Sequence, residues 1–370
     1  MMQYAYRKYR VSTCLTTEQK SEIRRLQHGQ RQAYNWAVSR IKDGWPVNNE
    51  YGLYKEHTIE RRDHEWMRVV PAAVQRAGIK DAFTVAKMSV KHGHGDLKYR
   101  TRRRQYSLKC PLAPVATADR HIIKLPRFGL VRAKIPSQIM EHEPRSYEFV
   151  PKGKEYLLYV SCRVPVPVPA WNTMKTVKGI DRGAVEPTVV ATLDQTGVVI
   201  SKDCYDTAAP FKENRAWYQI RQRRLSKMNP KSHRSKRLRN MIQKRMYRVS
   251  NRRTYAECIT AKHICQDHNP AAIILEDLRL DRMTRRSGAH KRGLNRKMRF
   301  VRHHMIGQRV RNRAELTGVQ IITTDPGYTS QECARCSHVD KESRITRDMF
   351  RCTRCNYVQQ ADINAAIIIG

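Results

Sequence analysis

Four cysteines close to the C-terminus form two CxxC pairs, Cys333 with Cys336 and Cys352 with Cys355. Fifteen residues separate the two pairs. Four thiolates in two such pairs are what a structural tetrahedral zinc ion requires, and a gap of about 15–20 residues is usual between the pairs. The spacing therefore predicts one structural zinc ion bound by these cysteines.

Three acidic residues stand where carboxylates could hold a second kind of metal. Asp181 ends the apolar segment 177–181, the segment 270–277 ends in Glu276 and Asp277, and Asp362 opens the last apolar stretch. Phosphodiester cleavage by two metal ions needs carboxylates that converge on two metals about 3.5–4 Å apart. Carboxylate oxygens are the hard ligands that magnesium prefers. Taken singly, each acid could equally be a helix cap or an ion-pair partner.

The charge balance points to a polyanionic partner. The chain has 72 Lys and Arg against 33 Asp and Glu, a formal net charge of +39 in 370 residues. Nucleic acid is the usual partner of a folded, strongly basic chain, although a ribosomal or structural basic protein has the same balance. The six cysteines outside the pairs lack ligand spacing, which favours reduced thiols and a reducing compartment. The N-terminus has no apolar signal-peptide region and no run approaches a membrane span, so we expect a soluble intracellular protein.

Basic residues concentrate in three tracts, 92–109, 215–256 and 279–313. The second has fifteen Lys or Arg and no acid, and such unrelieved like charge repels itself unless phosphates lie against it. Tyrosines between the arginines of the first tract suit base stacking as well as phosphate contact. The predicted nucleic-acid contacts are Lys98, Arg102, Arg103, Arg104, Arg223, Arg224, Lys236, Arg237, Arg245, Arg252, Arg253, Arg285, Arg286 and Arg296.

The N-terminal half reads as a β-domain interrupted by helices. Alternating aromatic and basic residues predict a strand over 3–15. Thr16 and Gln19 form a capping box that begins a helix ending near Lys42, and a further helical region covers 53–90. Short strands between 110 and 168 predict a small β-barrel or sandwich that the first strand could join. Pro165, Pro167 and Pro169 predict a stiff linker and a domain boundary.

The C-terminal half must position the three acids. Strands are expected over 177–181, 188–193 and 198–200, and three successive strands with an acid on the first are how an RNase H-like sheet begins. Two antiparallel basic helices are expected over 215–256, with Asn229-Pro230 between them. Strands ending near Asp277 and Asp325 follow.

These motifs together resemble the TnpB family, the OrfB-type "transposase" nucleases of prokaryotic insertion sequences, which are related to the type V CRISPR effectors. The resemblance covers nearly the full chain and is weakest over 16–105. The residues that carry it are GIDRG at 179–183, IILEDL at 273–278, DPGYTSQECARC at 325–336, FRCTRC at 350–355 and ADINAA at 361–366.

The resemblance implies an α+β multidomain fold. Its expected parts are a β-barrel wedge domain (1–15 and 106–169), a helical recognition insertion (16–105), an RNase H-like (RuvC) α/β nuclease domain (170–327 and 360–370) and an inserted zinc ribbon that binds target nucleic acid (328–359). Asp181, Glu276 and Asp362 are implied as catalytic ligands of two magnesium ions, and Cys333, Cys336, Cys352 and Cys355 as the zinc ligands.

The activity implied is RNA-guided, magnesium-dependent cleavage of DNA by an enzyme encoded in an insertion sequence. The implied partners are a guide RNA from the transposon end and target double-stranded DNA beside a short flanking motif, without a membrane or a small-molecule substrate. The protein is expected to act as a monomeric ribonucleoprotein in the prokaryotic cytoplasm, associated with the nucleoid.

Other functions stay open at this point. Arg182 directly after the first acid and a long following loop depart from the commonest family pattern. A repressor guided by RNA that does not cleave, a transposition accessory or regulatory DNA-binding protein, a transposase that joins ends without a guide, and a zinc-ribbon protein of a ribonucleoprotein particle are the alternatives. The intact set of three acids argues against the repressor.

Overall fold

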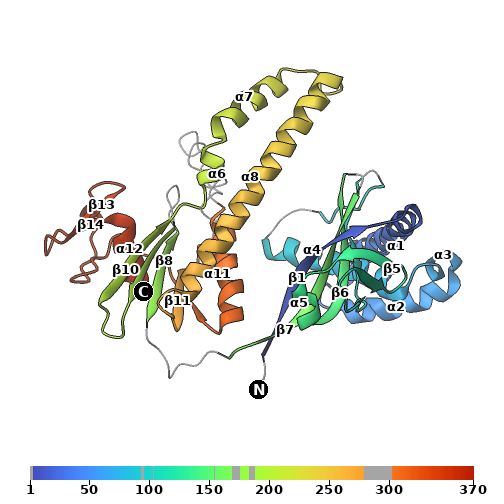
Figure 1. Ribbon diagram of the computed structural model, residues 1–370, viewed down its shortest axis with the longest axis horizontal. Helices are drawn as coiled ribbons and strands as arrows, with labels where there is room; N and C mark the ends of the chain where they lie inside the picture. The colour runs from blue at the N-terminus through green and yellow to red at the C-terminus, as the bar shows by residue number, and fades with distance from the viewer. Residues whose placement is uncertain are drawn as a thin grey trace. The chain divides into compact units, whose positions relative to one another are not determined.

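The computed structural model describes residues 3–92, 96–102, 104–153, 155–168, 176–182, 188–278 and 302–370 (Figure 1). The chain forms two compact units, Tyr4–Pro165 and a second that comprises Val166–Gly370 with Met1–Gln3. Among the helices of these described ranges, none is both long and apolar enough to cross a membrane.

A seven-stranded sheet organises the Tyr4–Pro165 unit, with the strand order β2-β6-β7-β1-β5-β4-β3. The prediction that the first strand joins the later strands is confirmed, because β1 lies between β7 and β5. The bounds are β1 (Gln3–Cys14), β2 (Leu108–Cys110), β3 (Val115–Ala116), β4 (Ile122–Leu125), β5 (Gly129–Lys134), β6 (Glu143–Lys152) and β7 (Glu155–Val166), with the short helix α5 (Ser137–Glu141) before β6.

The predicted linker begins later than the prolines suggested, since β7 runs through Pro165 to Val166. The paired residues of β6 and β7 end at Glu143 and Arg163, so Pro165 lies beyond this ladder and its missing N–H costs no hydrogen bond there. Pro169 lies outside the described residues.

Four helices between β1 and β2 form the helical part of this unit: α1 (Thr17–Lys42), α2 (Glu50–Asp63), α3 (Glu65–Arg68) and α4 (Ala72–His92). The predicted capping box is confirmed, because the Thr16 hydroxyl accepts from the Gln19 N–H at 3.2 Å and the Gln19 side chain accepts from the Thr16 N–H at 3.0 Å. Helices α1 and α4 pack closely together, with Ala37 and Ile79 fully buried in the core between the helices.

The second unit contains a five-stranded sheet with the order β10-β9-β8-β11-β12. Strands β10, β9 and β8 pair antiparallel, whereas β8, β11 and β12 pair parallel. The bounds are β8 (Val177–Arg182), β9 (Thr188–Leu193), β10 (Val199–Tyr205), β11 (Ala272–Glu276) and β12 (Gln320–Thr324).

Helices cover both faces of this sheet. The terminal helix α12 (Ala361–Ile369) contacts β8 and β9, and its Ala366 packs with Val189 and Ala191. The intervening Val190 points to the other face and packs with Ile264 of α8 (His233–Gln266) and Val310 of α11 (His303–Thr317). All residues of β9 are buried, because alternate side chains meet a helix on each face.

The expected pair of basic helices is present as α7 (Arg215–Ser226) and α8, which follow the short α6 (Ala209–Lys212). Figure 1 shows α7 and the first part of α8 extending away from the five-stranded sheet as a hairpin. The end of α8 returns to the sheet, where Ala261 and Ile264 are buried. One helix of 34 residues therefore joins a basic projection to the core.

Between β12 and α12 the chain builds a small substructure around the cysteines. It contains the 3-10 turn η3 (Lys341–Ser343) and the hairpin β13 (Met349–Arg351) with β14 (Val358–Gln360). Phe350 is fully buried against Cys333 and Cys352, so this region has a core of its own.

Candidate metal centres and nucleic-acid surface

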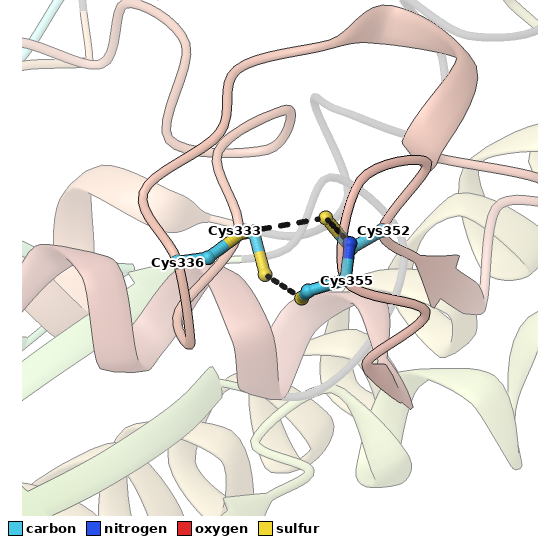
Figure 2. Close-up of side chains that lie close together, drawn as sticks. All are labelled: Cys333, Cys336, Cys352 and Cys355. Atoms are coloured by element: carbon cyan, nitrogen blue, oxygen red, sulfur yellow. Dashed lines mark hydrogen bonds between the residues drawn. The ribbon is translucent and has the colours of Figure 1, made fainter.

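The four cysteines of the two CxxC pairs come together in one cluster, with all ligand atoms within 4.8 Å of one another. Cys333 Sγ lies 3.7 Å from Cys355 Sγ, and Cys336 Sγ lies 3.6 Å from Cys352 Sγ (Figure 2). Four sulfurs bonded tetrahedrally to zinc at about 2.3 Å stand roughly 3.8 Å apart. The thiol set therefore fits a metal such as zinc.

Backbone N–H groups of the turns point at two of the sulfurs. Arg335 N donates to Cys333 Sγ at 3.4 Å, while Arg354 N and Cys355 N donate to Cys352 Sγ, each at 3.4 Å. These bonds favour the thiolate form, and the pKa of Cys352 falls to about 6 despite burial, which opposes the shift. At Cys333 burial outweighs the same kind of bond and the pKa is raised, so only the second turn lowers the pKa of the sulfur that it contacts.

The sheet register brings Asp181 and Glu276 side by side. Leu275 pairs with Ile180 in the parallel β8–β11 ladder, so the acid that follows each of them lies at the same edge of the sheet. Asp362 occupies the first turn of α12, which lies over β8. Gly179 permits that approach, since a Cβ there would clash with the backbone of Ala366 and Gly370.

Asp362 and Glu276 lie close enough to Asp181 to oppose its ionisation. The pKa of Asp181 is raised to about 7, chiefly by burial and then by the negative charges of Asp362 and Glu276. Burial also raises the pKa values of Glu276 and Asp362. Their separation exceeds that of the cysteines, because within the described ranges only the cysteine cluster brings three ligand atoms within 4.8 Å of one another.

Arg182 is buried beside this acidic site, with 7% of its surface exposed. Its guanidinium donates to the backbone carbonyl of Glu276, across the strand pair. Gly307 of α11 leaves the room, because a Cβ there would stand 2.8 Å from Arg182 Nη1. Arg182, which in the sequence was only a departure from the commonest family pattern, therefore supports the strand that carries Glu276.

Two further side chains that the sequence did not single out reach the acids from the cysteine region. Thr329 donates to Glu276 Oε1 at 2.8 Å, and Arg344 stands 3.4 Å from Asp362 Oδ1. Asn364, fully buried, accepts from Ala334 N at 3.0 Å and donates to the Glu332 carbonyl at 2.7 Å. The quoted motifs contain Thr329 and Asn364, but only folding shows what they join.

The predicted nucleic-acid contacts divide by exposure. Arg253 is 4% exposed and lies 3.4 Å from Glu257, which itself is buried, so its guanidinium belongs to the interior of the helix packing. Arg103, Arg285, Arg286 and Arg296 lie outside the described residues. The exposed ones are Lys98, Arg102, Arg104, Arg223, Arg224, Lys236, Arg237, Arg245 and Arg252.

Between α7 and α8 the basic projection is hollowed by a cavity of about 860 Å³. Two guanidiniums lie over the Trp217 ring. The distance to the ring centroid is 4.3 Å for Arg245 and 5.0 Å for Arg221. Arg245 Nε also donates to Asn214 Oδ1 at 2.9 Å. An aromatic ring among fixed arginines offers both stacking and charge, and the charge pattern alone did not reveal Trp217.

Known proteins are similar to this chain in sequence and in fold. The family model described as "Cas12f1-like, TNB domain" matches residues 303–369. InsQ of Escherichia coli (strain K12), named as an RNA-guided DNA endonuclease, is 24% identical over 94% of this chain and 88% of its own length. The TnpB-like protein aq_aa05 of Aquifex aeolicus (strain VF5) is 33% identical over 22% of this chain and 26% of its own.

Among solved structures, the Cas12f1-sgRNA-target DNA complex contains a chain that matches with a TM-score of 0.59. The match covers 96% of this chain and 83% of that chain at 16% identity, which shows a shared mixed α/β fold. The resemblance to the TnpB family that the motifs indicated is thereby confirmed on sequence, and the shared fold agrees with it.

Proposed function

We propose that this protein is an RNA-guided, magnesium-dependent DNA endonuclease encoded by an insertion sequence, with a RuvC-like nuclease domain formed by 170–327 and 360–370. Supporting it are three antiparallel strands followed by two parallel ones, the order of an RNase H-like sheet, with acids at adjacent strand ends. The name of InsQ supports the same activity for this chain.

The observation that carries the proposal is the meeting of Asp181, Glu276 and Asp362 from two strands and a helix. Burial raises the pKa of all three carboxyl groups, and the charges of Asp362 and Glu276 add to the shift at Asp181. Such groups bind a divalent cation readily, because the cation relieves both desolvation and repulsion. The donor set is entirely oxygen, as magnesium prefers. When bound, two magnesium ions would supply activation of water and stabilisation of the leaving oxygen in phosphodiester hydrolysis.

The chain's own residues hold that site in shape. Asp181 and Glu276 are fixed by the β8–β11 ladder, and Asp362 by the seat of α12 on Gly179. Arg182 and Thr329 orient Glu276 through its backbone and its side chain respectively. Recognition would be delegated: guide pairing reads the target, while protein contacts read backbone shape and a flanking motif.

The ribbon over 328–359 would hold one structural zinc ion and brace Asp362 and Glu276. The contacts of Arg344 and Thr329 with these acids support a bracing role. The ribonucleoprotein would act as a monomer on double-stranded DNA beside a short motif, with a guide derived from the transposon end.

The test is cleavage by the protein purified with its own RNA. That RNA is sequenced, a plasmid bearing the matching target is supplied with Mg²⁺, and Asp181→Asn is run beside the wild type. We expect a discrete RNA whose 3′ end extends into flanking DNA, and cleavage by the wild type only. Cleavage that persists in the variant would remove the carboxylate assignment, and strand joining without RNA would favour a transposase.

A further inference from the structure

A second concentration of positive charge lies in the Tyr4–Pro165 unit, far in sequence from the acids. A cavity of about 370 Å³ opens between helix α1 and a wall formed by Arg102 and the residues 104–106. We call it the arginine pocket, and its lining consists of Arg24, Gln27, His28, Arg31, Arg102, Arg104, Gln105 and Tyr106.

One wall of the pocket is a single face of α1. Arg24, His28 and Arg31 recur at helical spacing on that face, while Ile23 and Leu26 on another face are fully buried. The core therefore fixes the rotation of α1, and with it the direction of the arginines. Because the rotation of the helix is fixed, Arg24, His28 and Arg31 stay on the side of α1 that faces the pocket.

The opposite wall is tied to α1 by specific contacts. Gln27 donates to the Tyr106 carbonyl at 2.6 Å, and the Tyr106 hydroxyl accepts from Thr101 N at 3.1 Å. The Arg100 guanidinium lies 5.0 Å from the Tyr106 ring centroid. These contacts hold Tyr106 in place beside α1, so this part of the pocket wall is built before any ligand arrives.

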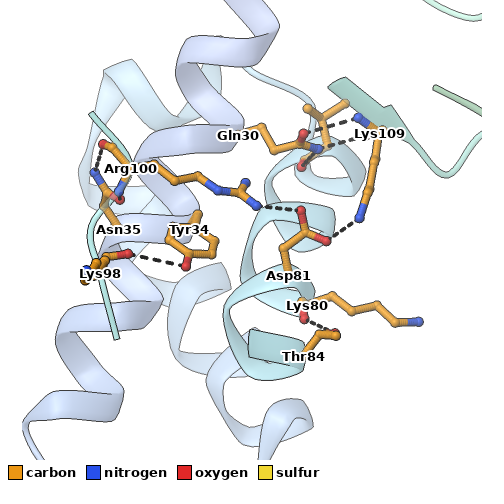
Figure 3. Close-up of polar contacts among 10 residues, drawn as sticks. Gln30, Tyr34, Asn35, Lys80, Asp81, Thr84, Lys98, Arg100 and Lys109 are labelled. Atoms are coloured by element: carbon orange, nitrogen blue, oxygen red, sulfur yellow. Dashed lines mark hydrogen bonds and ion pairs between the residues drawn. The ribbon is translucent and has the colours of Figure 1, made fainter. Parts of the chain in front are cut away.

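Asp81, an acid of the same unit, already pairs with two other cations. Figure 3 shows Asp81 between two cations, 3.0 Å from Arg100 and 2.6 Å from Lys109. By contrast, across the described residues no ion pair joins Arg24, Arg31, Arg102 or Arg104 to a carboxylate. Burial and the charge of Arg102 lower the pKa of Arg31, as expected where cations gather without a counter-charge.

Burial and the same arginines lower the pKa of His28, so the imidazole adds little positive charge at neutral pH. The field of the pocket therefore comes from its guanidiniums, which suit the oxygens of a phosphate through paired N–H donors. The tyrosine ring and two side-chain amides beside them suit the nucleoside attached to that phosphate.

We propose that the arginine pocket binds a backbone phosphate of a nucleic-acid strand, with Arg24 and Arg31 contacting it from α1 and Arg102 and Arg104 from the facing segment. The volume suits about one nucleotide, since ligand pockets of roughly 300 Å³ lie at the small end of the usual range. The inference rests on the proposed function for the identity of the ligand, and RNA and DNA share the phosphate chemistry.

The test measures binding without magnesium and without cleavage, so its failure is distinguishable from failure of the nuclease proposal. Full-length Arg24→Gln/Arg31→Gln is compared with the wild type against labelled single-stranded RNA, single-stranded DNA of the same sequence and the duplex. Arg62→Gln/Arg68→Gln removes two exposed arginines from the same unit and is the matched control.

We expect the pocket variant to bind its strand about 10- to 100-fold more weakly, with a salt dependence shallower by roughly 0.7 per lost phosphate contact. The control should change binding less than about threefold. Loss with RNA alone identifies an RNA phosphate, and loss with DNA alone identifies a DNA phosphate. Equal losses in the pocket and control variants would overturn the proposal, because they would reflect net charge only.

A measurement on the wild type protects the result against a variant that misfolds. Phenylglyoxal modification followed by mass spectrometry reports the reactivity of each arginine, and bound strand should protect Arg24 and Arg31 while leaving Arg62 reactive. Equal reactivity of Arg24 and Arg31 with and without the strand would contradict the proposal.

Discussion

The cysteine cluster and the carboxylate site are built on opposite principles. Each sulfur pair is set by one tight turn, and the turn's own N–H groups favour the thiolate. The three acids come from two strands and a terminal helix, and burial opposes their ionisation, with repulsion from Asp362 and Glu276 added at Asp181. A local site stabilises the fold around it when metal binds, whereas a site assembled from distant elements must be held by the rest of the fold.

The largest effect should come from breaking the local site with Cys352→Ser. Structural zinc contributes on the order of 10 kcal/mol to the folding of small zinc domains, so the region 328–359 should lose its structure. Cleavage should vanish because Arg344 and Thr329 would no longer hold the acids. Zinc content and hydrogen exchange measure the first loss, and plasmid cleavage measures the second.

Cys258→Ser is the control, since Cys258 is exposed and lies outside the cluster. RNA binding should survive in both variants. Loss of RNA binding on Cys352→Ser alone would make the ribbon part of the guide-binding surface and would end the separation of the two sites.

The second prediction breaks the assembled site. Asp181→Asn keeps the shape of the side chain but removes its charge, and should lower the cleavage rate by about 10³-fold, equivalent to several kcal/mol of lost transition-state stabilisation. Single-turnover cleavage measures the rate. Asp267→Asn, an exposed aspartate of the same unit, should cleave as the wild type does; equal loss in both would point to general destabilisation.

The third prediction uses the raised pKa of Asp181, which burial causes first and the charges of Asp362 and Glu276 second. Between the ordinary pKa of an aspartate and the raised value near 7, the unfolded chain has released a proton that native Asp181 still binds. Raising the pH through this window therefore lowers the free energy of unfolding, by roughly 4 kcal/mol for this group when magnesium is absent.

Urea unfolding of the wild type and of Asp181→Asn between pH 5 and pH 8 measures this dependence. The variant should gain stability relative to the wild type as the pH rises, and added Mg²⁺ should reverse the gain. A constant difference across that range would mean that Asp181 ionises normally in the native protein.

The smallest of these effects concerns the support of the acids. Arg182→Gln should weaken magnesium binding about 10- to 100-fold, as the loss of an outer partner of a metal site does. Gly307→Ala displaces the same guanidinium from the other side and should act in the same direction. The Mg²⁺ concentration for half-maximal cleavage measures both variants, and Arg182→Lys should recover part of the loss. An unchanged Mg²⁺ requirement in both would leave Arg182 a packing residue.

The same contrast explains what the sequence could reveal. The CxxC turns and the Thr16–Gln19 capping box join residues a few positions apart, and such patterns are visible in a sequence. Arg182 meets Glu276 across 94 residues, and Thr329 meets it across 53, so no spacing announces either contact. The ends of the expected strands indicated where two of the acids lie. The need for Gly179 and Gly307 became visible only in the fold, where α12 packs against Gly179 and Arg182 packs against Gly307.

The runs of basic residues in the sequence predicted a basic surface, but not which of those residues are exposed on it. Arg253 stands among exposed arginines in the sequence, yet it is buried one helical turn from Glu257. Counting charges cannot separate it from its neighbours, because which face of α8 meets the sheet is set by residues such as Ala261 and Ile264, far along the helix.

Helix α8 has a consequence for how stability is distributed along one continuous element. Its first half carries most of its exposed cations, and one face of its last half packs into the core. In the free protein, amide hydrogens should exchange within seconds to minutes near the exposed Arg239 and only on global unfolding near Ile264. A bound polyanion would neutralise the outer half and slow exchange there most, so the slope of protection along α8 reports how far nucleic acid extends over the hairpin.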